Sequence, residues 1–143
     1  MLPFTDHRAD PAAWADELGI SREAVEIYLA SEVIDLHVDA FIWHRVFGYD
    51  LTKRHELGMF GRRFWGHVDL PRALEAQLGG AIWVITTNPS RTAAGRAANF
   101  VRILAELRRL FASVDDQFRI VRSAAEYRAS SAAGKHGAFV GIQ

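Results

Sequence analysis

Hydrophobic and polar positions alternate with a period of two over residues 33–39, which predicts a β-strand. The apolar face of this strand is formed by Ile34, Leu36 and Val38. The opposite face ends in His37 and Asp39, whose side chains should point the same way, one pleat apart. An imidazole nitrogen and a carboxylate oxygen at that spacing can hold a metal ion such as zinc. The alternative is an edge strand with one polar face.

Two more apolar stretches predict strands, and the segments around them predict helices. Residues 80–87 scarcely alternate, which is typical of a strand buried on both faces, and residues 137–142 are apolar in the same way. Capping residues, glycine stops and apolar positions recurring every three or four residues mark the helices. The expected helices cover residues 11–18, 22–31, 70–78, 92–112 and 123–134. Residues 118–121 are expected to form a brief extended segment.

Residues 40–66 show no clear period and are expected to form a long ordered loop. Loops of this length are often functional, so this one is a candidate wall of a substrate pocket. Aromatic and basic residues are interleaved in it, as on some nucleic-acid surfaces, but no stacking motif or basic domain accompanies them. The aromatic residues are Phe41, Trp43, Phe47, Tyr49, Phe60, Phe64 and Trp65, and the basic ones are Arg45, Lys53, Arg54, Arg62 and Arg63.

Strands separated by helices predict an α/β fold with parallel strands and right-handed crossovers. In α/β barrels the functional side chains lie at the carboxyl ends of the strands. His37 and Asp39 end the first predicted strand. The second ends at Thr87 and Asn88, and the third ends at Gln143. This placement strengthens the interpretation of His37 and Asp39 as metal ligands.

The composition limits the classes of protein that remain. The chain of 143 residues has 17 basic and 17 acidic side chains, so its net charge of zero gives no general attraction to nucleic acid or an anionic membrane. The absence of cysteine excludes disulfides, thiolate metal sites and a cysteine nucleophile. No apolar run spans a bilayer and no secretory signal opens the chain, so a cytoplasmic location is expected. One domain is expected over residues 1–143, with a leading segment at 1–20.

A second His-x-Asp triplet, at His67 and Asp69, stands in a different context. Asp69 precedes a helical pattern that ends at Gly79, so its carboxylate is expected to cap that helix rather than bind a metal. His136 precedes the third predicted strand. It should lie at the end of the sheet opposite the chemistry, so we interpret it as structural.

Four stretches of the chain carry a resemblance to a known family. They are VIDLHVD at residues 33–39, HVDLPR at 67–72, GGAIWV at 79–84 and GKHGAFVGIQ at 134–143. The renal (membrane) dipeptidase family, within the amidohydrolase superfamily, has similar stretches in the same order: VIDGHND, TDLPRL, GGxxxQFWS and GKxAxxxGIEGG. The order and the spacing together make the resemblance fairly specific. It extends over nearly all of the sequence from about residue 20 onward.

The resemblance implies a (β/α)₈ barrel of the TIM type with a two-zinc centre that hydrolyses dipeptides. It implies that His37 and Asp39 bind one zinc and that position 143 bridges both metals. Later histidines of the family bind the second zinc and contact the substrate. The metals would activate a bridging water and polarise the peptide carbonyl. Within this chain the resemblance assigns no general acid or base and no substrate-binding residue.

The sequence departs from the family pattern at the metal site. Leu36 and Val38 replace glycine and asparagine, which should alter the pocket more than the ligation. Gln143 stands where the bridging glutamate belongs, and an amide offers one neutral oxygen in place of two anionic ones. We therefore expect weakened binding of at least one metal. Asp35 either orients a metal ligand or is satisfied by the backbone.

The chain covers about three of the eight strands of such a barrel, which takes roughly 250 residues. We therefore expect the N-terminal part of a longer protein, or a piece that needs the remainder of the barrel as a partner, and no catalysis by the chain alone. The leading function is a zinc-dependent dipeptidase-like hydrolase acting on a dipeptide or a related small amide. Two alternatives stay open: a non-catalytic relative that binds a ligand or partner, and a complete small α/β domain. The sequence does not decide the substrate preference, the metal identity or whether a homodimer forms.

Overall fold

The structure is a computed structural model that describes residues 1–56 and 66–143. Its strands are β1 Ile34–Val38, β2 Gly80–Ile85, β3 Phe118–Ile120 and β4 His136–Ile142. Its helices are η1 His7–Ala9, α1 Pro11–Leu18, α2 Arg22–Ala30, α3 Ala40–Phe47, α4 Leu70–Glu75, α5 Ala93–Ala112 and α6 Ala124–Ala132. The predicted strands and helices are confirmed in place and type. The largest shift of a helix end is at α4, which ends at Glu75.

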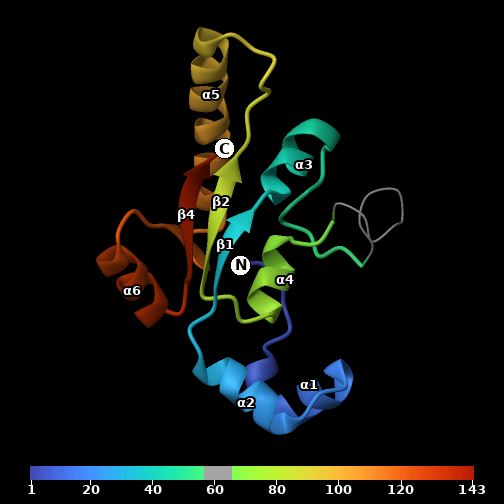
Figure 1. Cartoon of the computed structure of the whole chain (residues 1–143). Helices are drawn as coiled ribbons and strands as arrows, with labels where there is room; N and C mark the ends of the chain where they lie inside the picture. The colour runs from blue at the N-terminus through green and yellow to red at the C-terminus, as the bar shows by residue number, and fades with distance from the viewer. Residues whose placement is uncertain (57–65) are drawn as a thin grey trace.

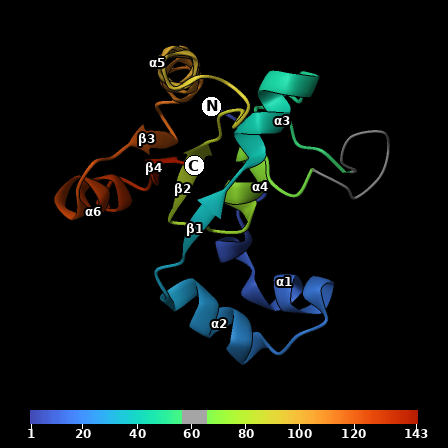
Figure 2. The ribbon, with the colours of Figure 1, turned by 45° about the horizontal axis from the view of Figure 1, so that its top comes forward.

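All neighbouring strands run parallel, in the order β1-β2-β4-β3. Figure 1 labels β1, β2 and β4, and Figure 2 also labels β3. β2 and β4 pair along the whole of β2, from Gly80 with Gly137 to Ile85 with Ile142. β3 arises from the segment predicted to be brief and extended, and it pairs only with the first part of β4. The chain order therefore reverses at this edge. The described strands form an open parallel sheet of the α/β class, and the closed barrel stays a prediction.

The predicted face assignment of β1 is wrong. Ile34 pairs with Gly80, but the register shifts within the strand and Val38 pairs with Trp83. Because Gly80 and Trp83 lie on opposite faces of β2, Ile34 and Val38 also lie on opposite faces. Leu36, inside this irregular stretch at the edge of the sheet, is 72% exposed. An irregularity of the β-bulge kind moves the alternation by one residue, which a strict period of two cannot anticipate.

One face of the sheet holds the main hydrophobic core under α3 and α5. Trp83 of β2 is fully buried there, and its ring packs edge-on against Phe111 of α5 with 5.3 Å between ring centroids. α6 lies on the other face, because its Tyr127 packs over Gly80 and Gly137. A Cβ atom at Gly137 would come within 2.5 Å of the Tyr127 ring, so this position requires glycine.

The leading segment and α2 form a small cluster of their own at the end of the sheet where the strands begin (Figure 2). Trp14 of α1 and Val25 of α2 are buried in it, and His7 stacks on Trp14 with ring centroids 4.8 Å apart. The Tyr28 hydroxyl donates a hydrogen bond to the Ala76 carbonyl at 2.6 Å. This bond connects α2 to Ala76, the C-cap residue just after α4.

The prediction of a loop over residues 40–66 is wrong for its first part, which forms α3. Phe41 is fully buried in the main core, and its ring stacks on that of His44 one turn later, with centroids 5.3 Å apart. Gly48 ends the helix with a positive φ of 67°. Outside the described residues lie Phe60, Arg62, Arg63, Phe64 and Trp65.

His136 is buried among aromatic rings at the start of β4, which agrees with its structural interpretation. Its Nε2 accepts a hydrogen bond from Trp83 Nε1–H at 3.3 Å, and its Nδ1 lies 2.8 Å from the Leu78 carbonyl oxygen, to which it donates. One nitrogen that accepts and one that donates define a neutral ring. Burial lowers the pKa of His136 from 6.5 to about 4.

We expect the neutral His136 to make the fold sensitive to acid. Its pKa is lowered by folding, so it stabilises the chain fully above pH 6.5 and loses this contribution as the pH falls toward about 4. The shift corresponds to about 3 kcal/mol in the free energy of unfolding. Urea unfolding measured from neutral pH down to about pH 4 should show a larger loss of unfolding free energy for the wild type than for His136→Gln. An NMR titration of this ring with its midpoint at an ordinary histidine pKa would contradict the prediction.

Candidate metal site at the carboxyl ends of the strands

His37 and Asp39 meet at the carboxyl end of β1. His37 Nε2 lies 3.1 Å from Asp39 Oδ2, and the two side chains are 54% and 44% exposed. Two ligands of a tetrahedral zinc, each about 2.0–2.1 Å from the metal, stand roughly 3.3 Å apart. The two atoms are therefore already close to the spacing at which both can bind one ion.

The Asp39 carboxylate is not used as a helix cap. Asp39 holds the N-cap position of α3, yet its side chain accepts no hydrogen bond from the amides of that helix. Its Oδ1 instead accepts a hydrogen bond from Thr86 Oγ1, beyond the end of β2, at 3.1 Å. The carboxylate thus bonds to the neighbouring strand end through one oxygen and faces His37 with the other.

The register of β1 and β2 explains why these three side chains meet. Val38 pairs with Trp83, whose side chain lies in the core under α5. Continued alternation from Trp83 places Thr86 on the face away from that core. The contacts of Asp39 with Thr86 and with His37 bring the other two side chains to the same place. All three stand at the carboxyl edge, where α/β proteins place their sites.

Gln143 follows β4 at the same edge. Ile142 pairs with Ile85, and the Gln143 backbone N–H donates to the Ile85 carbonyl at 3.1 Å. Continued alternation places Gln143 beside Thr86, two strands away from Asp39. Its assignment as a metal ligand stays a prediction, as do those of His37 and Asp39.

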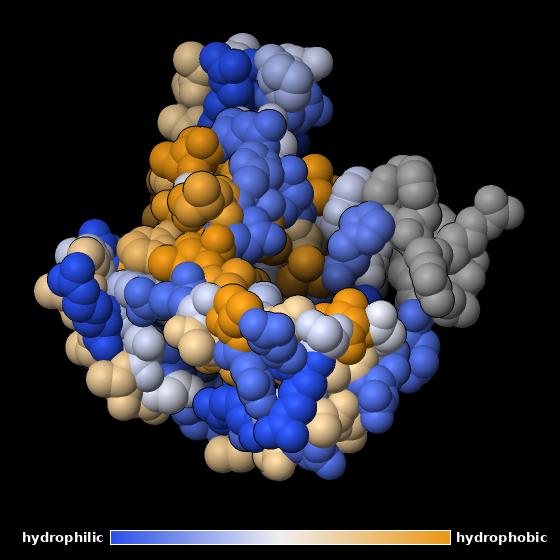
Figure 3. All heavy atoms as spheres, turned by 60° about the horizontal axis from the view of Figure 1, so that its bottom comes forward, coloured by the Kyte–Doolittle hydropathy of each residue, from blue (hydrophilic) through white to orange (hydrophobic). Residues whose placement is uncertain are grey.

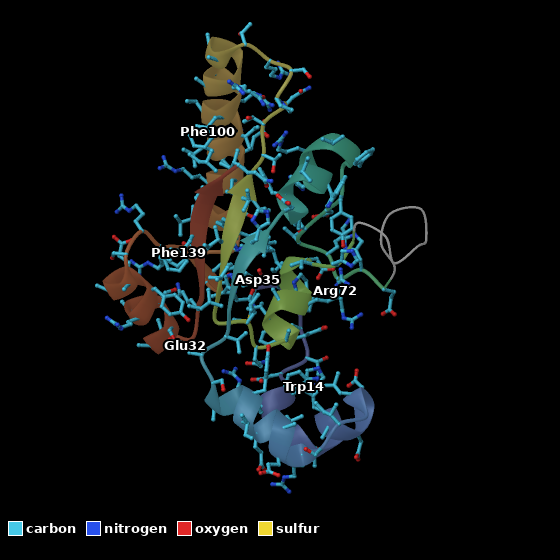
Figure 4. All side chains as sticks on the ribbon, viewed as in Figure 1. Trp14, Glu32, Asp35, Arg72, Phe100 and Phe139 are labelled. Atoms are coloured by element: carbon cyan, nitrogen blue, oxygen red, sulfur yellow. The ribbon has the colours of Figure 1, made fainter. Side chains whose placement is uncertain are left out.

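Asp35 bonds to the backbone of its own strand. Its Oδ1 accepts a hydrogen bond from the His37 backbone N–H at 2.8 Å, and Figure 4 labels it on β1. Of the two roles considered from the sequence, the structure therefore shows satisfaction by the backbone. The bond also holds the His37 peptide in place where the register of β1 shifts.

The second triplet has the structural role that its context predicts. Asp69 is fully buried, and its Oδ1 accepts a hydrogen bond from the Arg72 backbone N–H at 2.9 Å to cap α4. Its Oδ2 accepts from Arg72 Nε at 2.8 Å and from the His55 backbone N–H at 2.9 Å. Figure 4 shows Arg72 on α4. Both oxygens of Asp69 are engaged, while His67 is exposed to solvent.

The donors at the strand ends fit one metal ion held from one side. Within residues 1–56 and 66–143 no three His, Cys, Asp or Glu side chains lie together in an arrangement suited to a metal. His37 and Asp39 could supply two ligands, and Gln143 could add only a neutral amide oxygen. Nitrogen and carboxylate ligands suit zinc, and manganese or iron as well. The remaining coordination positions would fall to water or to ligands from elsewhere.

Sequence reasoning missed Thr86. It placed Thr87 and Asn88 at the end of the second strand, but β2 ends at Ile85 and Thr86 is the first residue beyond it. Alternation along β2 separates Thr86 from the buried Trp83 and assigns it to the other face. The alternation along β2 could be read from the sequence. The register shift in β1 could not, so the sequence did not show which residues of β1 lie near Thr86.

The parallel sheet and the polar pair at its carboxyl edge define an α/β protein of the kind whose site is built from strand ends. The sequence model of the membrane dipeptidase family (peptidase family M19) matches residues 21–143. The chain belongs to this family, which confirms the resemblance found in the sequence. Members of this family are metal-dependent hydrolases of the dipeptidase type. A comparison with curated proteins finds no match.

A helix that crosses a bilayer must be both long and apolar, and the helices of this chain can be judged by those two properties. None of those in the described part of the chain is both long and apolar enough to cross a bilayer.

Proposed function

We propose that this chain carries the first metal site of a metal-dependent dipeptidase. The supporting observation is the pair of His37 Nε2 and Asp39 Oδ2, 3.1 Å apart at the carboxyl edge and free of helix capping, in a chain of a dipeptidase family. The proposed ion is zinc, with His37, Asp39 and position 143 as its ligands. The proposed substrate is a dipeptide or a related small amide.

A zinc ion at this site would polarise the substrate carbonyl and lower the pKa of a bound water. In this chain His37 Nε2 and Asp39 Oδ2 would hold the ion. Both side chains are about half exposed, which leaves the other side of the ion open to substrate. The Thr86 hydroxyl keeps the second oxygen of Asp39 turned toward β2.

Gln143 supports the alternative of a non-catalytic relative. A bridging glutamate gives an anionic oxygen to each of two cations, whereas an amide gives one neutral oxygen and an N–H group that repels a metal. A centre that depends on that charge would bind its second metal weakly. The same fold would then serve to bind a ligand or a partner.

Changing Gln143→Glu should raise metal occupancy. The added carboxylate would stand beside Thr86 at the edge that already holds Asp39, and its charge offsets that of a second cation. We expect the affinity for the weaker metal to rise by more than the roughly tenfold change that an outer-shell substitution produces. Calorimetric titration with zinc measures this, and Gln77→Glu, at the opposite end of the sheet, is the matched control. Unchanged occupancy in Gln143→Glu would show that position 143 does not bridge.

We propose further that additional barrel strands cover the two open edges of the sheet. Among the described residues β1 pairs only with β2, and β3 covers only the first part of β4. Apolar side chains are left on the surface beside these edges, where Figure 3 shows hydrophobic atoms gathered next to α5. A groove beside α5 and β4 is lined by apolar side chains that include Phe100, Leu104, Ile120, Phe139, Val140 and Ile142.

The decisive experiment is the metal-to-protein ratio of the protein purified from its complete reading frame without a chelator. About two zinc equivalents, as in two-metal hydrolases, together with hydrolysis of dipeptides would support the proposal. A ratio near zero with the fold intact would favour the non-catalytic alternative. Light scattering on the same sample measures the mass of the particle. A second copy of the chain on the open edges doubles this mass, whereas further strands of the same chain leave it at that of one chain.

A further inference from the structure

We propose that Thr86 is a positioning residue that orients the Asp39 carboxylate for metal binding. This inference rests on the proposed function, because it concerns the same metal site. It assigns a role to a residue that the four sequence motifs do not contain.

The two oxygens of Asp39 have different partners. Oδ1 accepts from Thr86 Oγ1 at 3.1 Å, and Oδ2 lies 3.1 Å from His37 Nε2. A carboxylate free to rotate would exchange these positions and spend part of its time with neither oxygen toward the metal. The Thr86 hydroxyl fixes Oδ1, so Oδ2 stays on the side of His37. Outer groups that bond to a metal ligand commonly set its orientation in this way.

Asp39 lacks the anchor that usually fixes an aspartate at the start of a helix. Asp69 and Asp10 both accept a backbone N–H from the first turn of the helix that they cap. Asp39 does not, although it occupies the same position before α3. Among residues 1–56 and 66–143, the hydrogen bond from Thr86 is therefore the contact that holds Oδ1.

Thr86 is itself held in place from α3. Its carbonyl oxygen accepts a hydrogen bond from Arg45 Nη1 at 3.1 Å. The Arg45 side chain is partly buried, and desolvation lowers its pKa. Asp39 is the N-cap of α3 and Arg45 follows six residues later, so this helix and its cap bond to both the hydroxyl and the carbonyl of Thr86. The loop after β2 cannot move relative to Asp39 without breaking one of these two bonds.

The test compares zinc affinities of three variants of the complete protein by calorimetry. Thr86→Val removes the hydroxyl at nearly constant volume and should lower the affinity roughly 10–100-fold. Thr86→Ser restores a hydroxyl and should recover most of the affinity. Thr87→Val is the matched control, since the neighbouring threonine makes no side-chain hydrogen bond within the described residues, and it should bind like the wild type. Visible absorption of the Co²⁺-substituted protein should show altered coordination in Thr86→Val alone.

Each outcome decides between the inference and the proposed function. A wild type that binds zinc and a Thr86→Val variant within twofold of it would overturn the inference and leave the proposed function standing. Equal losses in Thr86→Val and Thr86→Ser would also overturn it, because a hydroxyl would then not be what matters. A wild type without affinity for zinc or Co²⁺ would overturn both. Urea unfolding of each variant shows whether a loss of affinity reflects a loss of fold.

Discussion

Replacing Asp69 by alanine should lower the free energy of unfolding by about 3–5 kcal/mol, because it removes one member of a buried ion pair. The carboxylate is fully buried and pairs with Arg72 Nε at 2.8 Å. It also caps α4 and accepts the His55 backbone N–H. The alanine variant leaves the Arg72 charge and two backbone donors without this partner. Urea unfolding at neutral pH measures the effect.

Asp10→Ala is the matched control for that prediction. Asp10 also caps a helix that has proline in its first turn, and it accepts the Ala13 N–H at 3.0 Å, but it is exposed and has no ion-pair partner within the part of the chain that the structure describes. Its loss should therefore lower the free energy of unfolding by only about 1 kcal/mol. If Asp69→Ala lowers the free energy of unfolding by no more than Asp10→Ala does, the ion pair of Asp69 with Arg72 is not what stabilises this region.

The two His-x-Asp triplets show what the sequence could predict. Both have the same three-residue pattern, and the residues that follow decide between cap and ligand. Pro71 and the helical pattern after Asp69 identified the cap, and the structure confirms it. Helix starts were predictable for the same reason, since Ser21 and Ser123 each accept a backbone N–H in the first turn. Local chemistry of this kind lies within a few residues of the chain.

The misassigned features depend on contacts far along the chain. The shift in β1 is visible only against β2, because it is a change of partner residues rather than of local pattern. α3 is held by the burial of Phe41 in a core that forms from β2 and α5, which its own irregular sequence does not reveal. The pairing of β3 with β4 reverses the strand order, and no three-residue segment encodes its neighbour.

The candidate site was predicted in part for the same reason. His37 lies on β1 and Asp39 is the first residue beyond it, so their spacing alone brought them together. Thr86 follows another strand, β2, and its contact with Asp39 depends on the register between β1 and β2. Gln143 was located by resemblance to the family motif, and the register of β4 places it at the same edge as the other two.

Replacing Asp39 by alanine should abolish zinc binding and leave the stability of the fold nearly unchanged. Asp39 is one of the two proposed ligands within the described residues, so the affinity lost on its removal should exceed the roughly 10–100-fold loss expected for an outer residue such as Thr86. Its side chain is 44% exposed and does not cap α3, so the free energy of unfolding should change by only about 0.5 kcal/mol. Zinc content after purification and urea unfolding measure the two effects on the same sample.

The control for Asp39→Ala comes from the other triplet. His37→Ala should match Asp39→Ala in its loss of zinc, because both residues are proposed ligands of one ion. His67→Ala changes the corresponding exposed histidine and should keep the zinc content of the wild type. Retention of zinc in both Asp39→Ala and His37→Ala would place the metal elsewhere. The contrast with Asp69→Ala, which should unfold the chain more readily, separates an aspartate that stabilises the fold from one whose carboxylate is available to a metal.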